Sequence, residues 1–119
     1  MLTLPNQAVY EEEVKRSRFI AKASRVGCPE EALAFLKHVG EKRATRNYWA
    51  YKIGCSYRFS DDGEPAGTAG KPILRAIERK KIDYAMIVVV RYFGGTRLRI
   101  AGLTRAYAGC AARRLQSKD

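Results

Sequence analysis

One run of six residues restricts the fold of this chain more than any other feature. Residues 85–90 read AMIVVV, an apolar and mostly β-branched stretch. Such a stretch is typical of a strand buried on both faces, because a strand with one solvent face alternates apolar with polar side chains. We therefore expect residues 85–90 to form a central strand. At 119 residues the chain has room for one domain with one core around it.

Secondary-structure signals on either side of this run complete the predicted architecture. Two-residue alternation predicts strands, and apolar residues at three- and four-residue spacing predict helices. The predicted strands are residues 9–16, 18–26, 48–59 and 85–90, and the predicted helices are residues 29–43, a helix opening at Pro72, and residues 100–115. The order β-β-α-β-α-β-α predicts a two-layer α+β domain: a mixed four-stranded sheet with helices on one face.

The long predicted strand 48–59 has two faces of different composition. Tyr48 and Ala50 lie on one face, whereas Trp49 and Ile53 lie on the other. The same alternation continued to the end of the strand places Tyr57 and Phe59 with Trp49.

The net charge of +11 is unevenly distributed along the chain. Residues 1–70 hold eleven Lys or Arg against nine Asp or Glu, a balance of +2, whereas residues 71–118 hold twelve against two, a balance of +10. Such a field attracts phosphate-rich partners or acidic protein surfaces, although charged helix faces also serve solubility.

Several classes of protein do not fit the composition. No apolar run is long enough to cross a bilayer, and the first residues lack the basic and apolar regions of a secretory signal, so we expect a cytoplasmic protein without membrane contact. The three cysteines, Cys28, Cys55 and Cys110, fit neither a disulfide framework nor a zinc site and are predicted to be buried free thiols. The single histidine, His38, is predicted to interact with the dipole at a helix end.

Residues 60–72, SDDGEPAGTAGKP, predict a shaped loop. Thirteen positions hold three acids, three glycines and two prolines, which disfavour both helix and strand. The loop can be a connection whose turns need these residues, or a binding loop. A Walker A phosphate loop is excluded because Pro72 stands where a Ser or Thr must bind Mg²⁺. A weaker anion site remains, because Gly67, Thr68 and Gly70 precede a helix N-terminus beside Lys71.

The acids of this loop allow two roles. Asp61, Asp62 and Glu64 could be metal ligands or a general acid/base pair. Alternatively, Asp61 and Asp62 accept backbone amides in the turn or pair with an arginine such as Arg91. The second role is favoured, because such turns commonly use Asp in this way. No nucleophile with an adjacent base is visible in the sequence, so catalysis has no obvious carrier.

A second irregular segment follows the buried strand, in VVVRYFGGTRLR (88–99). Arginines interleaved with aromatic residues suit base stacking combined with phosphate neutralisation, and core aromatics with solvated flanking charge explain the pattern equally well. The residues concerned are Arg91, Tyr92, Phe93, Gly94, Gly95, Arg97 and Arg99.

Three segments together resemble a known family. DDGEPAGTAGKPIL (61–74), VVVRYFGGTRL (88–98) and GLTRAY (102–107) closely resemble the amino-terminal domain of the Impact family, called YigZ in bacteria. The likeness runs from about Lys15 or Ser17 through Tyr107, and extends toward Leu115. The resemblance implies the ribosomal-protein-like α/β fold of the fourth domain of elongation factor G. It also implies that residues 1–119 are a single domain of this type, without the second domain that family members usually carry.

The resemblance implies a role in translation regulation during stress. Eukaryotic relatives bind a ribosome-associated activator of a stress-responsive kinase, and a nucleic-acid or ribosome-binding role is proposed for bacterial relatives. The signature loop carried over from the family is Asp61, Asp62, Gly63, Glu64, Pro65, Gly67, Thr68, Gly70 and Pro72. The second motif carried over is Arg91, Tyr92, Phe93, Gly94, Gly95, Leu98, Gly102, Leu103, Arg105, Ala106 and Tyr107.

This chain departs from the family pattern at three positions. Arg99 and Ala101 replace glycines, so Arg99 either blocks a close approach to the backbone or adds a cation to the surface. Arg46 stands where the family commonly has a histidine, which puts any activity of that histidine in doubt.

Three functional hypotheses follow. In the first, the chain is a non-catalytic binding domain without cofactor or metal, and both motifs together with Lys71, Arg97, Arg99 and Arg105 bind RNA, the ribosome or an acidic ribosome-associated protein. In the second, Asp61, Asp62 and Glu64 serve a metal- or phosphate-dependent enzyme or a small-ligand sensor. In the third, both motifs are a folding device. The first is the leading hypothesis.

Overall fold

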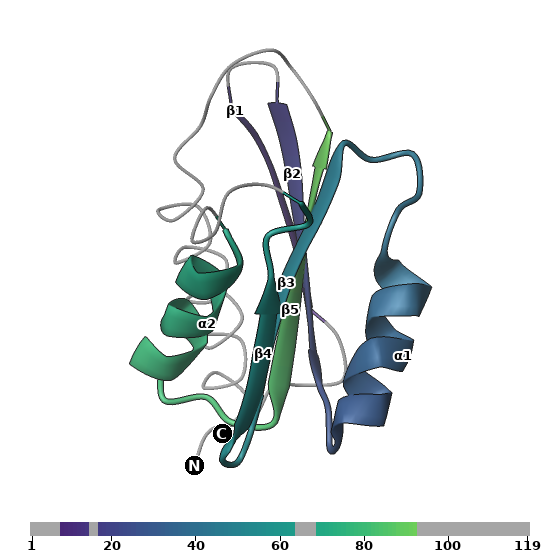
Figure 1. Cartoon of the computed structure of the whole chain (residues 1–119). Helices are drawn as coiled ribbons and strands as arrows, with labels where there is room; N and C mark the ends of the chain where they lie inside the picture. Colours follow the sequence, from purple (N-terminus) through teal and green to yellow (C-terminus); the bar gives the residue numbers. More distant parts are fainter. Residues whose placement is uncertain (1–7, 15–16, 64–68, 93–119) are drawn as a thin grey trace.

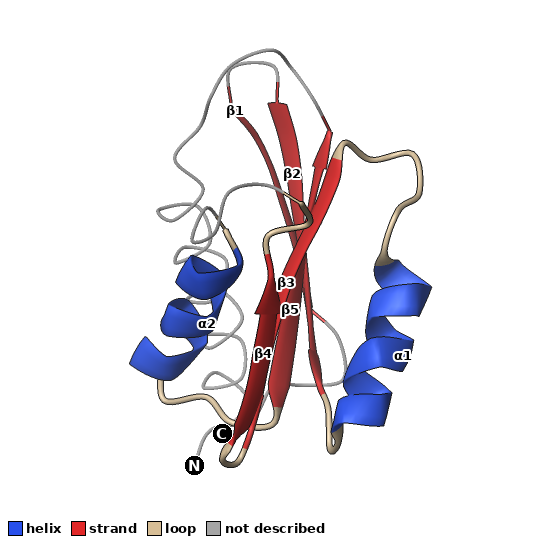
Figure 2. Ribbon diagram, in the orientation of Figure 1, coloured by secondary structure: helices blue, strands red, loops and turns tan. Residues whose placement is uncertain are grey.

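The computed structural model describes residues 8–14, 17–63 and 69–92, and these form one antiparallel sheet with two helices (Figures 1 and 2). The strands are β1 (Ala8–Val14), β2 (Ser17–Arg25), β3 (Arg46–Ile53), β4 (Ser56–Ser60) and β5 (Ala85–Tyr92), and the helices are α1 (Pro29–Val39) and α2 (Gly70–Arg79). The spatial order is β1-β2-β5-β3-β4.

Four of these strands and the two helices follow one another along the chain as β-α-β-β-α-β, from β2 to β5, and β1 adds an edge strand beside β2. The α+β class and a central strand at 85–90 are therefore confirmed. All described strand pairs are antiparallel, so the predicted mixed sheet is wrong. The predicted helix over residues 100–115 lies outside the described residues.

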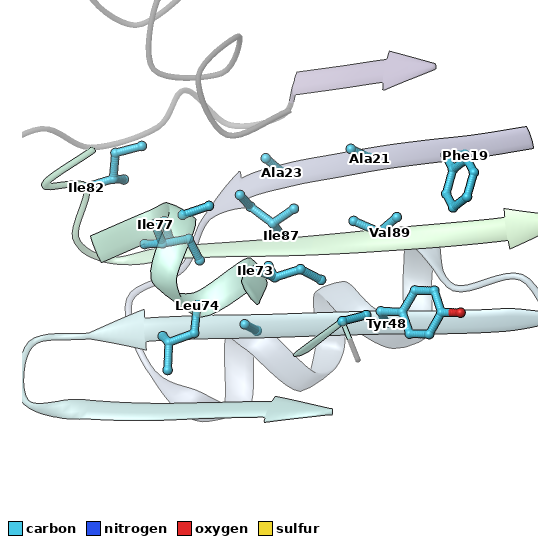
Figure 3. Close-up of a cluster of buried hydrophobic side chains, with 14 residues drawn as sticks. Phe19, Ala21, Ala23, Tyr48, Ile73, Leu74, Ile77, Ile82, Ile87 and Val89 are labelled. Atoms are coloured by element: carbon cyan, nitrogen blue, oxygen red, sulfur yellow. The ribbon is translucent and has the colours of Figure 1, made fainter. Parts of the chain in front are cut away.

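The central strand β5 separates two apolar clusters. Ile87 and Val89 pack on one face with Ile73 and Ile77 of α2, as Figure 3 shows. Met86, Val88 and Val90 point to the other face and pack with α1, through Ala32, Phe35 and Val39. The two helices therefore cover opposite faces of the sheet (Figure 1), and the prediction of helices on one face is wrong.

This arrangement has a consequence for the handedness of the connections. α1 connects β2 to β3, which run parallel with β5 between them, and α2 connects β4 to β5, which run parallel with β3 between them. The two connections run in opposite directions across the sheet, and their strands also point in opposite directions. A rotation by 180° about the normal of the sheet therefore superimposes one connection on the other. Two connections of equal handedness would thus have their helices on the same face. Because they lie on opposite faces, one connection is left-handed, the rare form.

The predicted long strand at residues 48–59 is a hairpin of two strands. Ile53 pairs with Ser56 across a two-residue turn, in which Gly54 has φ of +59°. A glycine with positive φ in the first loop position is typical of tight hairpin turns. The reversal pairs Phe59 with Ala50 and places it on the α2 face. The prediction that Tyr57 and Phe59 share the face of Trp49 is therefore wrong.

Helix α1 ends earlier than the predicted residue 43. The Gly40 amide donates a hydrogen bond to the Leu36 carbonyl at 2.8 Å, and the backbone of Gly40 is extended. A Cβ at position 40 would lie 2.8 Å from that same carbonyl oxygen, so glycine fits this helix end. His38 lies in the last turn, as predicted.

The prediction of buried thiols fails at Cys55. Its side chain is exposed in the β3–β4 turn, because the turn that reverses the chain projects from the sheet, whereas Cys28 is partly buried before α1. Cys110 lies outside the described residues.

Candidate functional site

The first carboxylate of the signature loop binds the start of α2. Asp61 Oδ1 accepts hydrogen bonds from the backbone amides of Ala69 at 2.8 Å and Gly70 at 2.7 Å. Both of these residues are buried, so the amides need a partner inside the protein. The negative charge also suits the positive end of the helix dipole. The sequence suggested an anion site at this helix N-terminus. In the structure, the carboxylate of Asp61 accepts the hydrogen bonds of the amides of Ala69 and Gly70 there.

The second carboxylate holds the start of β3. Asp62 Oδ2 accepts a hydrogen bond from the backbone amide of Asn47 at 2.7 Å. The Arg46 guanidinium donates a hydrogen bond to the backbone carbonyl of Asp62 at 3.1 Å. Asp62 has φ of +48° and Gly63 has φ of +85°, so the chain turns sharply here. These contacts fix the turn against the first residues of β3. They match the structural role that the sequence favoured for these acids.

Glycine is required at the first residue of α2. A Cβ built on Gly70 would lie 2.7 Å from the Ser60 carbonyl oxygen and 2.8 Å from its nitrogen. The end of β4 and the start of α2 are therefore in direct backbone contact. This contact closes the signature loop at its base.

The described part of the second motif lies at the same end of the sheet. Arg91 pairs with Arg46 across β5 and β3, and its guanidinium lies over the Phe19 ring at 5.7 Å from the centroid. Arg46 also contacts Asp62, so it lies between the two motifs. Tyr92 is covered by the Arg18 guanidinium at 5.7 Å. The segments Asp61–Gly63 and Arg91–Tyr92 thus meet the same stretch of β3 and its neighbours.

Most of the predicted binding surface has no described position. Within it, the structure describes Asp61, Asp62, Gly63, Gly70, Lys71, Arg91 and Tyr92. The residues that lie outside the described part are Glu64, Pro65, Gly67, Thr68, Phe93, Gly94, Gly95, Arg97, Arg99, Arg105 and Tyr107.

A row of exposed cations runs along the outer side of α2. Lys71, Arg75 and Arg79 recur every four residues, so they share the helix face opposite the buried Ile73 and Ile77. Lys80 and Lys81 follow the helix and are also exposed, and Glu78 is the acid of this helix. Of these cations, the predicted site contained Lys71, and the i, i+4 spacing was the signal for Arg75 and Arg79.

Lys71 is unfavourably placed for the stability of the helix. It lies in the first turn, where the helix dipole disfavours a cation, and α2 has no acid in that turn. The carboxylate of Asp61 supplies the negative charge from outside the helix.

The described acids do not form a metal-binding group. Across residues 8–14, 17–63 and 69–92, no cluster of three or more His, Cys, Asp or Glu side chains could hold a metal ion. Asp61 and Asp62 instead accept backbone amides. Glu64, the third acid of the enzyme hypothesis, lies outside these residues. No helix in the same part of the chain is long and apolar enough to cross a membrane.

Comparison with protein families identifies the chain. The model of the Impact N-terminal domain matches residues 15–115. The chain belongs to the Impact family. An Impact family member from Thermus thermophilus is 54% identical over 103 residues, which cover 87% of this chain and 57% of the relative. The chain spans about half the length of the bacterial Impact relatives it matches.

Two solved structures resemble the Impact domain described above. One, a crystal structure of a hypothetical protein, has a TM-score of 0.80 and 35% identity, with 98% of this chain and 60% of that chain covered. The other is the two-domain translational regulator Yih1, with a TM-score of 0.54 and 24% identity, covering 98% of this chain and 46% of that chain. The second likeness concerns the fold alone.

Proposed function

We propose that this Impact domain is a non-catalytic binding module of a translation regulator and contacts RNA, free or within the ribosome. The observation that carries the proposal is a set of exposed cations: the row Lys71, Arg75 and Arg79 on α2, with Lys80 and Lys81 directly after the helix. Regularly spaced cations on one face neutralise successive phosphates of a nucleic acid.

The charge of the whole chain supports the same partner. Residues 71–118 have twelve bases against two acids, so the α2 face belongs to the more positive part of the chain. A field of this sign attracts a polyanion before any specific contact forms. The link to translation comes from the family and from Yih1, a translational regulator that shares the fold.

The acids of the signature loop have a supporting role in this function. Asp61 and Asp62 hold the start of α2 and the start of β3 in place. They therefore fix the orientation of Lys71 and the helix that carries the other cations. The loop positions the binding face without performing a reaction.

The proposal is tested by a filter-binding titration of the chain with a short RNA at increasing salt concentration. If the five exposed cations each meet a phosphate of a single strand, log K falls with log[salt] with a slope of about −3.5. Absence of binding at low salt would overturn the assignment to RNA. In that case, binding of an acidic ribosome-associated protein is the outcome to measure next.

A further inference from the structure

Two exposed aromatic side chains lie together on the edge strand β4. Tyr57 is 58% exposed and Phe59 is 39% exposed. Their cross-strand partners in β3 are Lys52 and Ala50, so both rings project from the same face of the sheet. Single exposed apolar side chains are common, but two aromatic rings on one face of a five-residue strand form a local surface.

This aromatic pair lies on the face of the sheet that α2 covers. Ala50, the partner of Phe59, is buried in the cluster that contains Ile73 and Ile77 of α2. The start of α2 touches the backbone of Ser60 at the end of β4, and the helix then packs over β3 and β4 on this face of the sheet (Figures 1 and 2). The exposed rings therefore lie on the same face of the sheet as α2, the helix that carries the cations.

The combination fits one class of ligand. An aromatic ring stacks on an unpaired base whatever its identity, and a neighbouring cation neutralises the phosphate that joins it to the next base. A base-paired duplex hides the faces of its bases within the stack. A ring on a protein surface therefore has little to gain from duplex RNA, whereas a cation binds both forms.

An extended peptide added to the β4 edge fits less well. Arg58 lies in the middle of this strand, and its guanidinium lies over the Trp49 ring at 5.8 Å on the other face. A charged residue in an edge strand is a common means of discouraging further strand pairing. The charge of the neighbouring helix also favours a polyanion over a neutral peptide.

We infer that Tyr57 and Phe59 stack on unpaired bases of single-stranded RNA, while the cations of α2 neutralise its phosphates. This inference rests on the proposed function and narrows its ligand to single-stranded RNA. It also adds two residues from β4 to a surface that the sequence assigned to the glycine-rich loops.

The test compares a labelled oligouridylate with an RNA hairpin duplex of similar total charge, using fluorescence anisotropy at one low salt concentration. The wild type should bind the oligouridylate more tightly. The double variant Tyr57→Leu and Phe59→Leu, which keeps apolar volume but removes both rings, should lose at least about fivefold affinity per ring for the oligouridylate. Its affinity for the duplex should stay within about twofold, because the cations are unchanged.

Control variants separate stacking from folding. Tyr57→Phe keeps a ring and should bind as the wild type does. Leu33→Ala removes an exposed apolar side chain from α1 on the opposite face, and should also leave affinity unchanged. Because Tyr57 is more than half exposed, Tyr57→Leu alone tests the inference if the double variant proves unstable in thermal unfolding.

The outcomes distinguish this inference from the proposed function. If the wild type binds neither RNA, the proposed function fails, and the inference fails with it. If the wild type binds both RNAs and the leucine variants bind the oligouridylate as well as the wild type does, the stacking role is wrong and the proposed function stands.

Discussion

A few single residues at the junction of β4 and α2 fix the conformation of this site. Gly70 and Ser60 are in backbone contact, Asp61 bridges to the helix amides, and Asp62 bridges to Asn47. The sequence predicted that glycines and acids shape this loop. It does not predict which backbone amides donate to the acids, because Asn47 is separated from Asp62 by a hairpin, and the side-chain alternation predicts one strand there.

Gly70→Ala should destabilise the protein although alanine favours helix. The helical preference of alanine over glycine is about 1 kcal/mol, whereas forcing a methyl group against packed atoms costs about 1–3 kcal/mol. Here the obstructing atoms belong to the Ser60 backbone, which cannot rotate away. Urea denaturation should therefore show a lower midpoint.

Gly27→Ala is the matched control for this variant. A Cβ at Gly27 would lie 3.4 Å from the Glu31 carboxylate, an ordinary contact with a flexible side chain. Its stability should stay within about 0.5 kcal/mol of the wild type. Equal stability of the two variants would contradict the close contact at Gly70.

Asp61→Ala should destabilise the protein by about 1–3 kcal/mol, because two buried amides lose their acceptor. Asp61→Asn keeps a side-chain oxygen, and asparagine caps helices about as well as aspartate. The loss of stability caused by Asp61→Asn should therefore be clearly smaller than that caused by Asp61→Ala in the same denaturation experiment. If Asp61→Ala is as stable as the wild type and yet loses RNA affinity, Asp61 is a binding residue and not a positioning residue.

At the scale of elements, Asp83 joins two turns. Its Oδ1 accepts the amides of Gly54 at 2.9 Å and Tyr84 at 2.8 Å, and the Lys52 ammonium lies 3.6 Å away. Partial burial alone would raise the pKa of Asp83, but the two amides and Lys52 outweigh it and hold the pKa below its usual range. The β3–β4 turn is thus tied to the segment that enters β5.

This interaction predicts a pH-dependent contribution to stability. Because the pKa of Asp83 is lowered by folding, its charged form stabilises the protein above the usual aspartate pKa of about 4, and this stabilisation is lost as the pH falls through the folded pKa. Asp83→Asn should cost about 1–2 kcal/mol near pH 7 in urea denaturation. The difference from the wild type should shrink as the pH falls below about 4, and a constant difference would contradict this role of the charge.

The β3–β4 hairpin shows why element boundaries were harder to predict than element types. The alternation on each side of Gly54 is strong, so the pattern alone predicts one strand over residues 48–59. A glycine followed by one residue between two alternating runs is also a hairpin signal, and the structure follows that signal. The error placed Tyr57 and Phe59 on the wrong face and kept them out of the predicted surface.

For the molecule as a whole, the run 85–90 predicted the centre of the fold correctly. Its six residues are buried, with alternate side chains in the two clusters. A strand that is buried on both faces needs an element packed on each face of the sheet. Helix α1 covers one face and helix α2 covers the other. The helix placement could not be derived from local pattern, because it depends on the handedness of a connection, and one connection here is left-handed.

The central claim for the whole molecule is that α2 carries the RNA-binding face. It is tested most directly by reversing three of its cations, Lys71, Arg75 and Arg79, to glutamate. The matched control reverses three exposed cations at the end of α1 and after it, Lys37, Lys42 and Arg43, which changes the net charge by the same amount.

Both triple variants should be compared with the wild type by filter binding to one short RNA at one salt concentration. Long-range attraction falls equally in both, so a specific face should appear as a further loss in the α2 variant alone. We predict at least about tenfold weaker binding for the α2 variant than for the α1 variant. Equal losses in the two variants would contradict the assignment of the binding face to α2.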